Sequence, residues 1–135
     1  MQAASPLHVL VIDDHRTMRK IIGRCLREIS ITAIDNAGNG AEALTWLSLP
    51  NNDPDMIICD LHMDEMDGLE FCNAVRRGKG LRDPNIPILL LTGESDRILL
   101  EVSEKVGVKT VLQKPITAQE LGTAIASVVG FEIAC

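Results

Sequence analysis

Met56-Ile57-Ile58-Cys59-Asp60 is the stretch that decides the fold, because it is an apolar run that ends at an acid. Consecutive apolar residues with β-branched members are typical of a strand buried on both faces of a parallel sheet. The residues from Leu61 to Gly68 are expected to form a loop that leads into a helix. Asp60 is therefore predicted at the carboxyl end of a buried strand, the edge at which open parallel sheets bind ligands.

Strand-like and helix-like segments alternate on both sides of this stretch. The predicted strands cover residues 7–12, 31–35, 56–60, 88–91 and 110–113. A helix is expected after each strand, and the fourth helix is predicted from about Asp96 to Gly107. Three of the helices begin with cap spacing, at Asn39–Glu42, Asp67–Glu70 and Thr117–Glu120. The alternation predicts an α/β fold with a five-stranded parallel sheet and five helices on both faces. Among such folds we expect the flavodoxin-like, doubly wound class with the strand order 2-1-3-4-5.

The helical faces follow from apolar spacing. In the first helix the apolar side chains recur every three or four residues and include Ile21 and Ile22, whereas the cations lie largely on the other face. Those cations are Arg16, Arg19, Lys20, Arg24 and Arg27. In the second helix Ala41, Leu44 and Leu47 are predicted to point inward. We expect one domain over residues 1–135, with a core of about 7–129 and no output domain.

Composition narrows the function. Of the 135 residues, 46% are hydrophobic and only 2% are aromatic, so the core must be aliphatic. The net charge of -6 disfavours non-specific binding to nucleic acid or to anionic membranes. Neither a signal peptide nor a spanning segment is predicted, so we expect a cytoplasmic protein. The four cysteines lack a C-x-x-C spacing, and reduced thiols are expected rather than a zinc site.

Polar residues follow four of the predicted strands where each strand ends. They are Asp13-Asp14, Asp60, Thr92 and Lys114. Because parallel strands end at one edge, these side chains are expected to converge, with Asp13 and Asp14 facing Asp60 across the crevice between strands one and three. Carboxylates gathered so closely need a hard divalent cation, and Mg²⁺ fits this donor set.

Each of these residues also has an ordinary structural interpretation. The two neighbouring acids could cap a helix, Thr92 could be a turn hydroxyl and Lys114 could be a solvated lysine. Together, however, a carboxylate, a cation site, a lysine and a hydroxyl suit attack on phosphorus and formation of an aspartyl phosphate. We therefore favour the chemical interpretation of the set.

The sequence resembles the receiver domain of two-component response regulators. The resemblance rests on Val11-Ile12-Asp13-Asp14, on Asp60-Leu61-His62-Met63 through Met66-Asp67-Gly68, on Leu91-Thr92-Gly93 and on Lys114-Pro115, and it extends from about Leu7 to Val129. The opening from Asp13 to Arg19 is similar to that of stand-alone chemotaxis regulators.

The resemblance implies a role for each site residue. Asp60 would accept phosphate from a histidine kinase or histidine phosphotransfer protein. Asp14, Asp60 and the backbone carbonyl of His62 would ligate Mg²⁺, Asp13 would act through a water, and Thr92 and Lys114 would contact phosphoryl oxygens. The protein would then be a phosphorylation-activated switch and not an enzyme, and a downstream protein would read the face formed by the fourth helix, fifth strand and fifth helix.

The chain departs from the family pattern at a few positions. Asp64 replaces a usual proline, Gly93 replaces a usual alanine, and Val111 replaces an aromatic residue that rotates on phosphorylation. His62 and Glu94 occupy variable positions that influence how long the phosphate lasts, and His62 could equally be an exposed loop histidine.

Three other functions compete with the switch. The first is a phosphate sink that drains a kinase and has no target. The second is a Mg²⁺-dependent phosphatase or phosphotransferase that acts on a small substrate. His62 argues against it, because the relevant enzyme family has a second Asp two residues after the nucleophile. The third is an interaction module that is never phosphorylated, and the complete set of acids, Thr92 and Lys114 argues against it.

Overall fold

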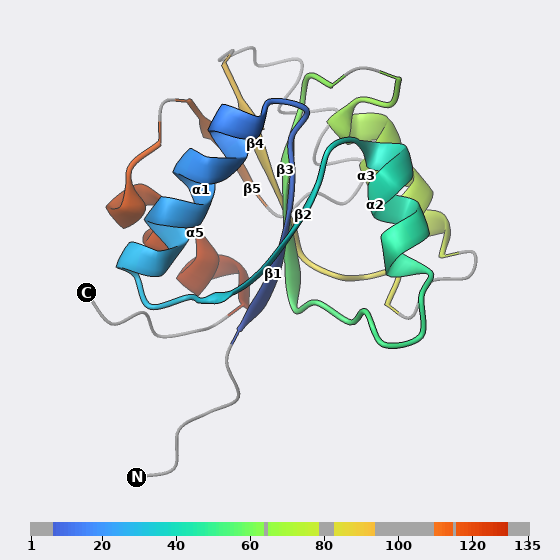
Figure 1. The fold of residues 1–135 in the computed structure, drawn as a ribbon, viewed down its shortest axis with the longest axis horizontal. Helices are drawn as coiled ribbons and strands as arrows, with labels where there is room; N and C mark the ends of the chain where they lie inside the picture. The colour runs from blue at the N-terminus through green and yellow to red at the C-terminus, as the bar shows by residue number, and fades with distance from the viewer. Residues whose placement is uncertain (1–6, 64, 79–82, 94–109, 115, 130–135) are drawn as a thin grey trace, which may run out of the picture.

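A five-stranded parallel sheet with helices on both faces forms the molecule (Figure 1). The computed structural model describes residues 7–63, 65–78, 83–93, 110–114 and 116–129. The strands are β1 (His8–Ile12), β2 (Ala33–Ala37), β3 (Met56–Asp60), β4 (Ile88–Thr92) and β5 (Thr110–Gln113), and they lie in the order β2-β1-β3-β4-β5. The predicted strand order is therefore confirmed.

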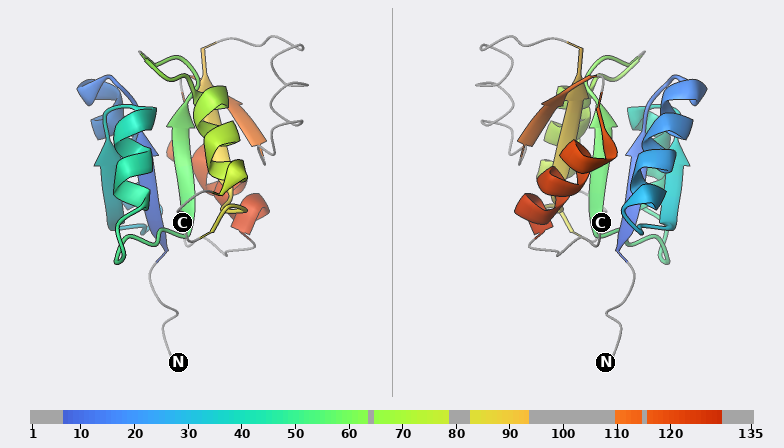
Figure 2. Two further views of the ribbon diagram at one scale, coloured as in Figure 1. Left: turned by 90° about the vertical axis from the view of Figure 1, so that its right-hand side faces the viewer. Right: turned by 90° about the vertical axis from the view of Figure 1, so that its left-hand side faces the viewer.

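Four helices lie within the described residues. They are α1 (Arg16–Glu28), α2 (Gly40–Leu47), α3 (Gly68–Arg77) and α5 (Ala118–Val129). The helices α1 and α5 cover one face of the sheet, and α2 and α3 cover the other (Figures 1 and 2). The predicted helix between Asp96 and Gly107 lies outside the described residues. None of the helices in the described ranges is long and apolar enough to cross a membrane.

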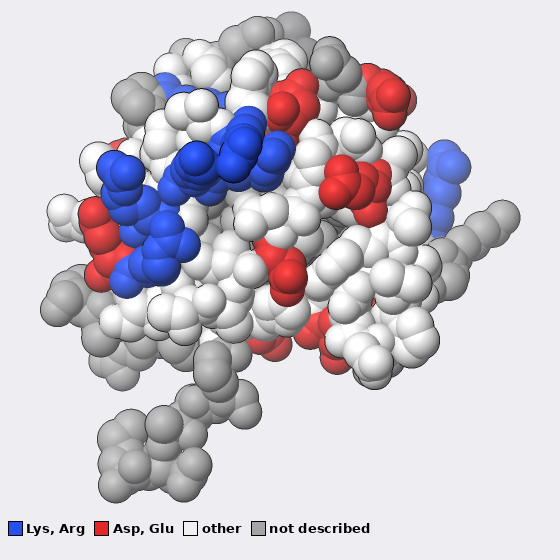
Figure 3. Space-filling model, in the orientation of Figure 1, with Lys and Arg blue, Asp and Glu red and all other residues white. Residues whose placement is uncertain are grey.

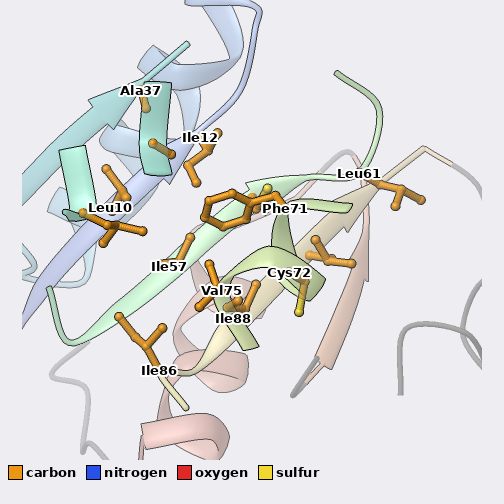
Figure 4. Close-up of a cluster of buried hydrophobic side chains, with 14 residues drawn as sticks. Leu10, Ile12, Ala37, Ile57, Leu61, Phe71, Cys72, Val75, Ile86 and Ile88 are labelled. Atoms are coloured by element: carbon orange, nitrogen blue, oxygen red, sulfur yellow. The ribbon is translucent and has the colours of Figure 1, made fainter. Parts of the chain in front are cut away.

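The central strand β3 is buried along its whole length, as its apolar run predicts. Its side chains alternate between the two helical layers, so that Ile57 packs with α2 and α3 and Ile58 packs with α1 and α5. On the first side, Phe71 and Val75 project from α3 toward the sheet (Figure 4). Close packing on both faces fixes where β3 ends, and this positions Asp60.

The caps agree with the sequence at two helices and differ in detail at the third. Asp67 and Glu70 form a complete capping box at α3, and Thr117 and Glu120 exchange the same pair of bonds at α5. At α2, the Asn39 side chain accepts a bond from the Glu42 backbone at 2.8 Å, but the Glu42 carboxylate accepts from the backbone N–H of Gly38.

Strand β2 begins two residues later than predicted, because the end of α1 uses the intervening residues. Ser30 adopts a left-handed conformation with φ 70°, and the backbone N–H of Ile31 donates to the Leu26 carbonyl at 2.9 Å. This turn satisfies carbonyls left open at the helix end. Ile31 remains buried in the core although it precedes the strand.

Two helical faces were also predicted slightly wrongly. Ala41 is exposed, and the buried alanine of α2 is Ala43. Ile21 of α1 is 41% exposed, whereas its neighbour Ile22 is fully buried. Both errors lie at the edge of the inward face, where neighbouring apolar residues leave the limits of that face ambiguous.

Candidate functional site

The polar residues singled out by the sequence lie together at one edge of the sheet. Asp13 follows β1, Asp60 ends β3, Thr92 ends β4 and Lys114 follows β5. These four strands are hydrogen-bonded neighbours, and the parallel register pairs Ile12 with Cys59 and Thr92 with Gln113. Parallel pairing therefore brings side chains from distant parts of the chain to one crevice.

Lys114 and Asp60 form the closest ion pair of this crevice. The Lys114 Nζ lies 2.7 Å from Asp60 Oδ1 and 3.6 Å from Asp13 Oδ2. The backbone of Lys114 is fixed as well, because its N–H donates to the Thr92 carbonyl at 2.7 Å. The ammonium is thus held beside Asp60, the carboxylate that the sequence predicts to be phosphorylated. Thr92 is buried at the end of the neighbouring strand β4.

The acids form a compact group with His15. Ligand atoms of Asp13, Asp14, His15 and Asp60 all lie within 4.8 Å of one another. Asp13 is fully buried and Asp60 is 3% exposed, so water screens these charges poorly. Burial raises the pKa of Asp60 above its usual range, the Lys114 hydrogen bond lowers it, and the negative charges of Asp13 and Asp14 raise it again.

A divalent cation fits this donor set. Asp13 Oδ2 is buried and has no hydrogen-bond partner among the described residues, so its remaining contact is the longer one to Lys114. One ammonium cannot balance three neighbouring carboxylates, and hard cations prefer carboxylate oxygens. The residues that would hold the cation are therefore Asp13, Asp14 and Asp60.

The sequence missed two residues that organise the acids. His15 lies at the N-cap of α1, its backbone N–H donates to Asp13 Oδ1 at 2.8 Å, and its ring Nδ1 lies 2.9 Å from Asp14 Oδ1. Arg19 donates from its guanidinium to the Asp13 carbonyl oxygen at 2.6 Å. Helical spacing could have suggested Arg19, because it lies one turn after the N-cap, on the same side of α1.

Gly68 sets the position of the loop that follows Asp60. A Cβ at Gly68 would lie 2.7 Å from the Asp60 carbonyl oxygen and 2.9 Å from Leu90 Cδ2. The Gly68 N–H donates to the Leu61 carbonyl at 2.8 Å, which closes the loop back onto β3. His62 is exposed in this loop, and the role of its carbonyl stays a prediction. Asp64 and Glu94 lie outside the described residues.

Comparison with known proteins identifies the family of the chain. The family model of the response regulator receiver domain matches residues 9–126. The chain belongs to this family. The receiver domain is also similar to the probable chemotaxis protein CheY of Rhizobium etli, at 30% identity over 96% of this chain and 98% of that protein. The chemotaxis protein CheY of Pseudomonas aeruginosa is 33% identical over 90% of this chain and 95% of its own length.

Solved structures agree with the sequence relatives. The chemotaxis protein CheY4 of Vibrio cholerae superposes with a TM-score of 0.80 at 29% identity, covering 92% of this receiver and 99% of that chain. A response regulator from Chloroflexus aurantiacus gives a TM-score of 0.81 at 28% identity, covering 94% of this receiver and 100% of that chain. The chain is thus a receiver domain of the CheY type, a phosphorylation-dependent signalling switch.

Val111 is the departure that the structure places most clearly. It lies on β5, opposite Leu90 of β4, and is partly buried against the cluster that α2 and α3 cover. Gly93, by contrast, is exposed, and a Cβ there would meet nothing within 4 Å. The alanine that is usual in this family would therefore fit this receiver without rearrangement.

Proposed function

We propose that Asp60 is the phosphoacceptor of this receiver and that it takes its phosphoryl group from a histidine kinase or a histidine phosphotransfer protein. The observation that carries the proposal is the 2.7 Å contact between Lys114 Nζ and Asp60 Oδ1 inside the group of acids. The Asp60 carboxylate attacks phosphorus, the P–N bond to the donor histidine breaks, and the imidazole leaves with the electron pair and takes up a proton.

The surrounding residues act on charge and position. The Lys114 ammonium stabilises the negative charge that develops on the phosphoryl oxygens, and the Thr92 hydroxyl donates a hydrogen bond to one of these oxygens. Asp13 and Asp14, with Asp60 and the His62 carbonyl, would hold Mg²⁺. A bound Mg²⁺ would supply positive charge that offsets the negative charge of the carboxylates and of the incoming phosphoryl group. Loss of the phosphate requires a water to attack phosphorus, so that the P–O bond to Asp60 breaks and inorganic phosphate leaves. The receiver assists this reaction only on its own phosphoryl group, so we do not class it as an enzyme.

Residues 7–129 are proposed to act as one receiver unit in the cytoplasm whose state is read by a separate protein. The support is that the two CheY relatives are matched over 98% and 95% of their own lengths. The predicted reading face includes β5 and α5, and its fourth helix lies outside the described residues. A related segment occurs in the sensor histidine kinase CheAY of Helicobacter pylori, of which this chain covers 14%.

The test is incubation with acetyl phosphate and Mg²⁺ followed by intact mass measurement. We expect one added phosphoryl group on the native receiver, none on Asp60→Asn, and none when Mg²⁺ is chelated. Uptake by Asp60→Asn, or no uptake by the native protein, would refute the assignment of Asp60.

A phosphate sink remains the second candidate, and Val111 is the observation that favours it. A half-buried aliphatic residue on β5 has no ring to rotate when Asp60 changes state. A switch is expected to bind a partner more tightly when phosphorylated, whereas a sink is expected to lose its phosphate rapidly and to bind no target in either state. The phosphate lifetime and the difference in partner affinity therefore separate the two.

A further inference from the structure

Cations gather along helix α1 although the chain carries a net charge of -6. Arg16, Arg19, Lys20 and Arg27 line a groove of about 430 Å³ between α1 and strand β2, here called the α1–β2 groove. Figure 3 shows blue side chains in a band across this side of the molecule. The volume lies within the range of about 300–1,000 Å³ typical of small-molecule sites.

The lining of the α1–β2 groove is polar and cationic. On the β2 side it is formed by Ile34 and Asn36, which share one face of the strand, and by Thr32 just before the strand. Among the residues that the structure describes, no carboxylate and no aromatic ring belongs to the lining. The groove therefore offers positive charge and hydrogen-bond donors, but no aromatic surface on which a ring could stack.

The groove cations are not neutralised by acids of the described chain. No carboxylate within the described ranges forms an ion pair with Arg16, Lys20 or Arg27. Arg16 and Lys20 stand four residues apart, a spacing at which like charges on a helix repel each other. A cluster that repels itself and lacks an internal counterion is suited to an external anion.

One guanidinium group is held in place before any ligand arrives, and a second lies against the helix at a glycine. Arg19 donates to the Asp13 carbonyl oxygen at 2.6 Å. The Arg27 guanidinium lies over Gly23, with its NH1 3.3 Å from where a Cβ would be. Glycine is unfavourable inside a helix, and here its missing side chain leaves room for Arg27 at the floor of the groove. Such preorganisation reduces the entropy lost on binding.

We propose that the α1–β2 groove binds a small organic or inorganic polyphosphate, held by its phosphate groups. Guanidinium groups match phosphate oxygens in paired hydrogen bonds, and several of them converge on a volume of metabolite size. A long nucleic acid fits less well, because a net charge of -6 repels an extended polyanion beyond the groove. The phosphates could belong to a free polyphosphate chain or to a nucleotide, and the experiment distinguishes these sources.

The experiment is calorimetric titration of the purified receiver with inorganic tripolyphosphate and with ATP, in buffer with a chelator so that Mg²⁺ is absent. Amide shifts in NMR spectra locate the bound anion. We expect saturable 1:1 binding, with shifts at Lys20, Gly23 and Asn36. Equal affinity for the two probes would show that phosphates alone are recognised, and tighter binding of ATP would show that the nucleoside adds contacts; both outcomes support the proposal.

Variants make the test specific. Arg16→Gln combined with Lys20→Gln is expected to weaken tripolyphosphate binding by about a hundredfold, since each of the two lost charge-assisted bonds is worth about a factor of ten. Arg24→Gln is the matched control, because Arg24 is exposed on the same helix but does not line the groove. It should change the affinity less than about twofold, since exposed charges at a distance are screened by salt.

The outcomes separate this inference from the assignment of Asp60. Asp60→Asn should bind tripolyphosphate as well as the native receiver does. The proposal is overturned if neither probe binds, if Arg24→Gln loses as much affinity as the double variant, or if a short poly-glutamate peptide binds more tightly than tripolyphosphate. The last result would assign the groove to an acidic protein segment instead.

Discussion

Replacing Gly68 by alanine tests whether the loop after Asp60 is held by close packing. The new Cβ would lie 2.7 Å from the Asp60 carbonyl oxygen and 3.0 Å from Leu61 Cα, and both are backbone atoms. Backbone atoms cannot rotate away as the end of a side chain can, so the loop or the start of α3 must move. Gly93→Ala is the matched control at the next strand end, because its Cβ meets nothing within 4 Å.

The expected magnitudes follow from these distances. Overpacking a well-packed site costs about 1–3 kcal/mol. At about 4 °C per kcal/mol for a domain of this length, Gly68→Ala should lower the Tm by roughly 4–12 °C. Gly93→Ala should leave the free energy of unfolding unchanged or raise it by up to about 1 kcal/mol, because alanine restricts the unfolded chain.

Urea unfolding followed by circular dichroism measures both variants, and Mg²⁺ titration adds a second readout. Gly68→Ala should also bind Mg²⁺ more weakly, since the displaced loop begins at the Asp60 carbonyl and carries the predicted His62 ligand. If the free energy of unfolding of Gly68→Ala stays within about 0.5 kcal/mol of the native value, the close approach does not constrain the loop. An equal loss in Gly93→Ala would point to a general effect of alanine and refute the packing argument.

Three further predictions concern the charges of the crevice. Without Mg²⁺, the raised pKa of Asp60 makes the folded state bind its proton more tightly than the unfolded state. The free energy of unfolding of the native receiver should therefore fall as the pH rises from about 4 through the raised pKa. Urea titrations at several pH values should show no such fall for Asp60→Asn, which should be more stable than the native receiver at neutral pH. Lys114→Gln should cost about 1–3 kcal/mol in urea unfolding and slow phosphorylation by acetyl phosphate, because the Asp60 carboxylate loses its 2.7 Å partner. Asp13→Asn should weaken Mg²⁺ binding by about tenfold or more in calorimetric titration, and an unchanged affinity would remove Asp13 from the cation site.

The sequence could predict the sheet and the convergence of the acids for a geometric reason. A fully apolar run such as Ile88 to Leu91 has one stable environment, and parallel strands must end at a common edge. In the strand order 2-1-3-4-5 only β4 separates the end of β3 from the end of β5, so the long Lys114 side chain can reach Asp60. The 2.7 Å separation of their side chains agrees with that reasoning.

What the sequence could not predict depends on interactions that leave no periodic signal. The start of β2 depends on the left-handed turn at Ser30, a residue type that does not usually adopt it. The contact of Arg19 with the Asp13 carbonyl depends on the exact rotation of α1. The sequence also does not distinguish the empty space around Gly93 from the crowded space around Gly68, because a glycine by itself does not show what surrounds it.

In the crevice, the free energy gained by apolar packing exceeds the repulsion between the acids. This explains why removing an acid is predicted to raise stability and not to lower it. Strands β1 and β3 place Asp13 and Asp60 together because their aliphatic side chains are fully buried, each worth about 1.5–3 kcal/mol on burial. The repulsion between the acids is smaller than that sum, so the fold forms and the repulsion remains in the cation-free state. Removing an acid and adding a cation relieve the same repulsion, and both should therefore stabilise the receiver. Only the cation does so while leaving the Asp60 carboxylate available for the proposed attack on phosphorus, and this would explain why a receiver domain retains acids that its fold would be more stable without.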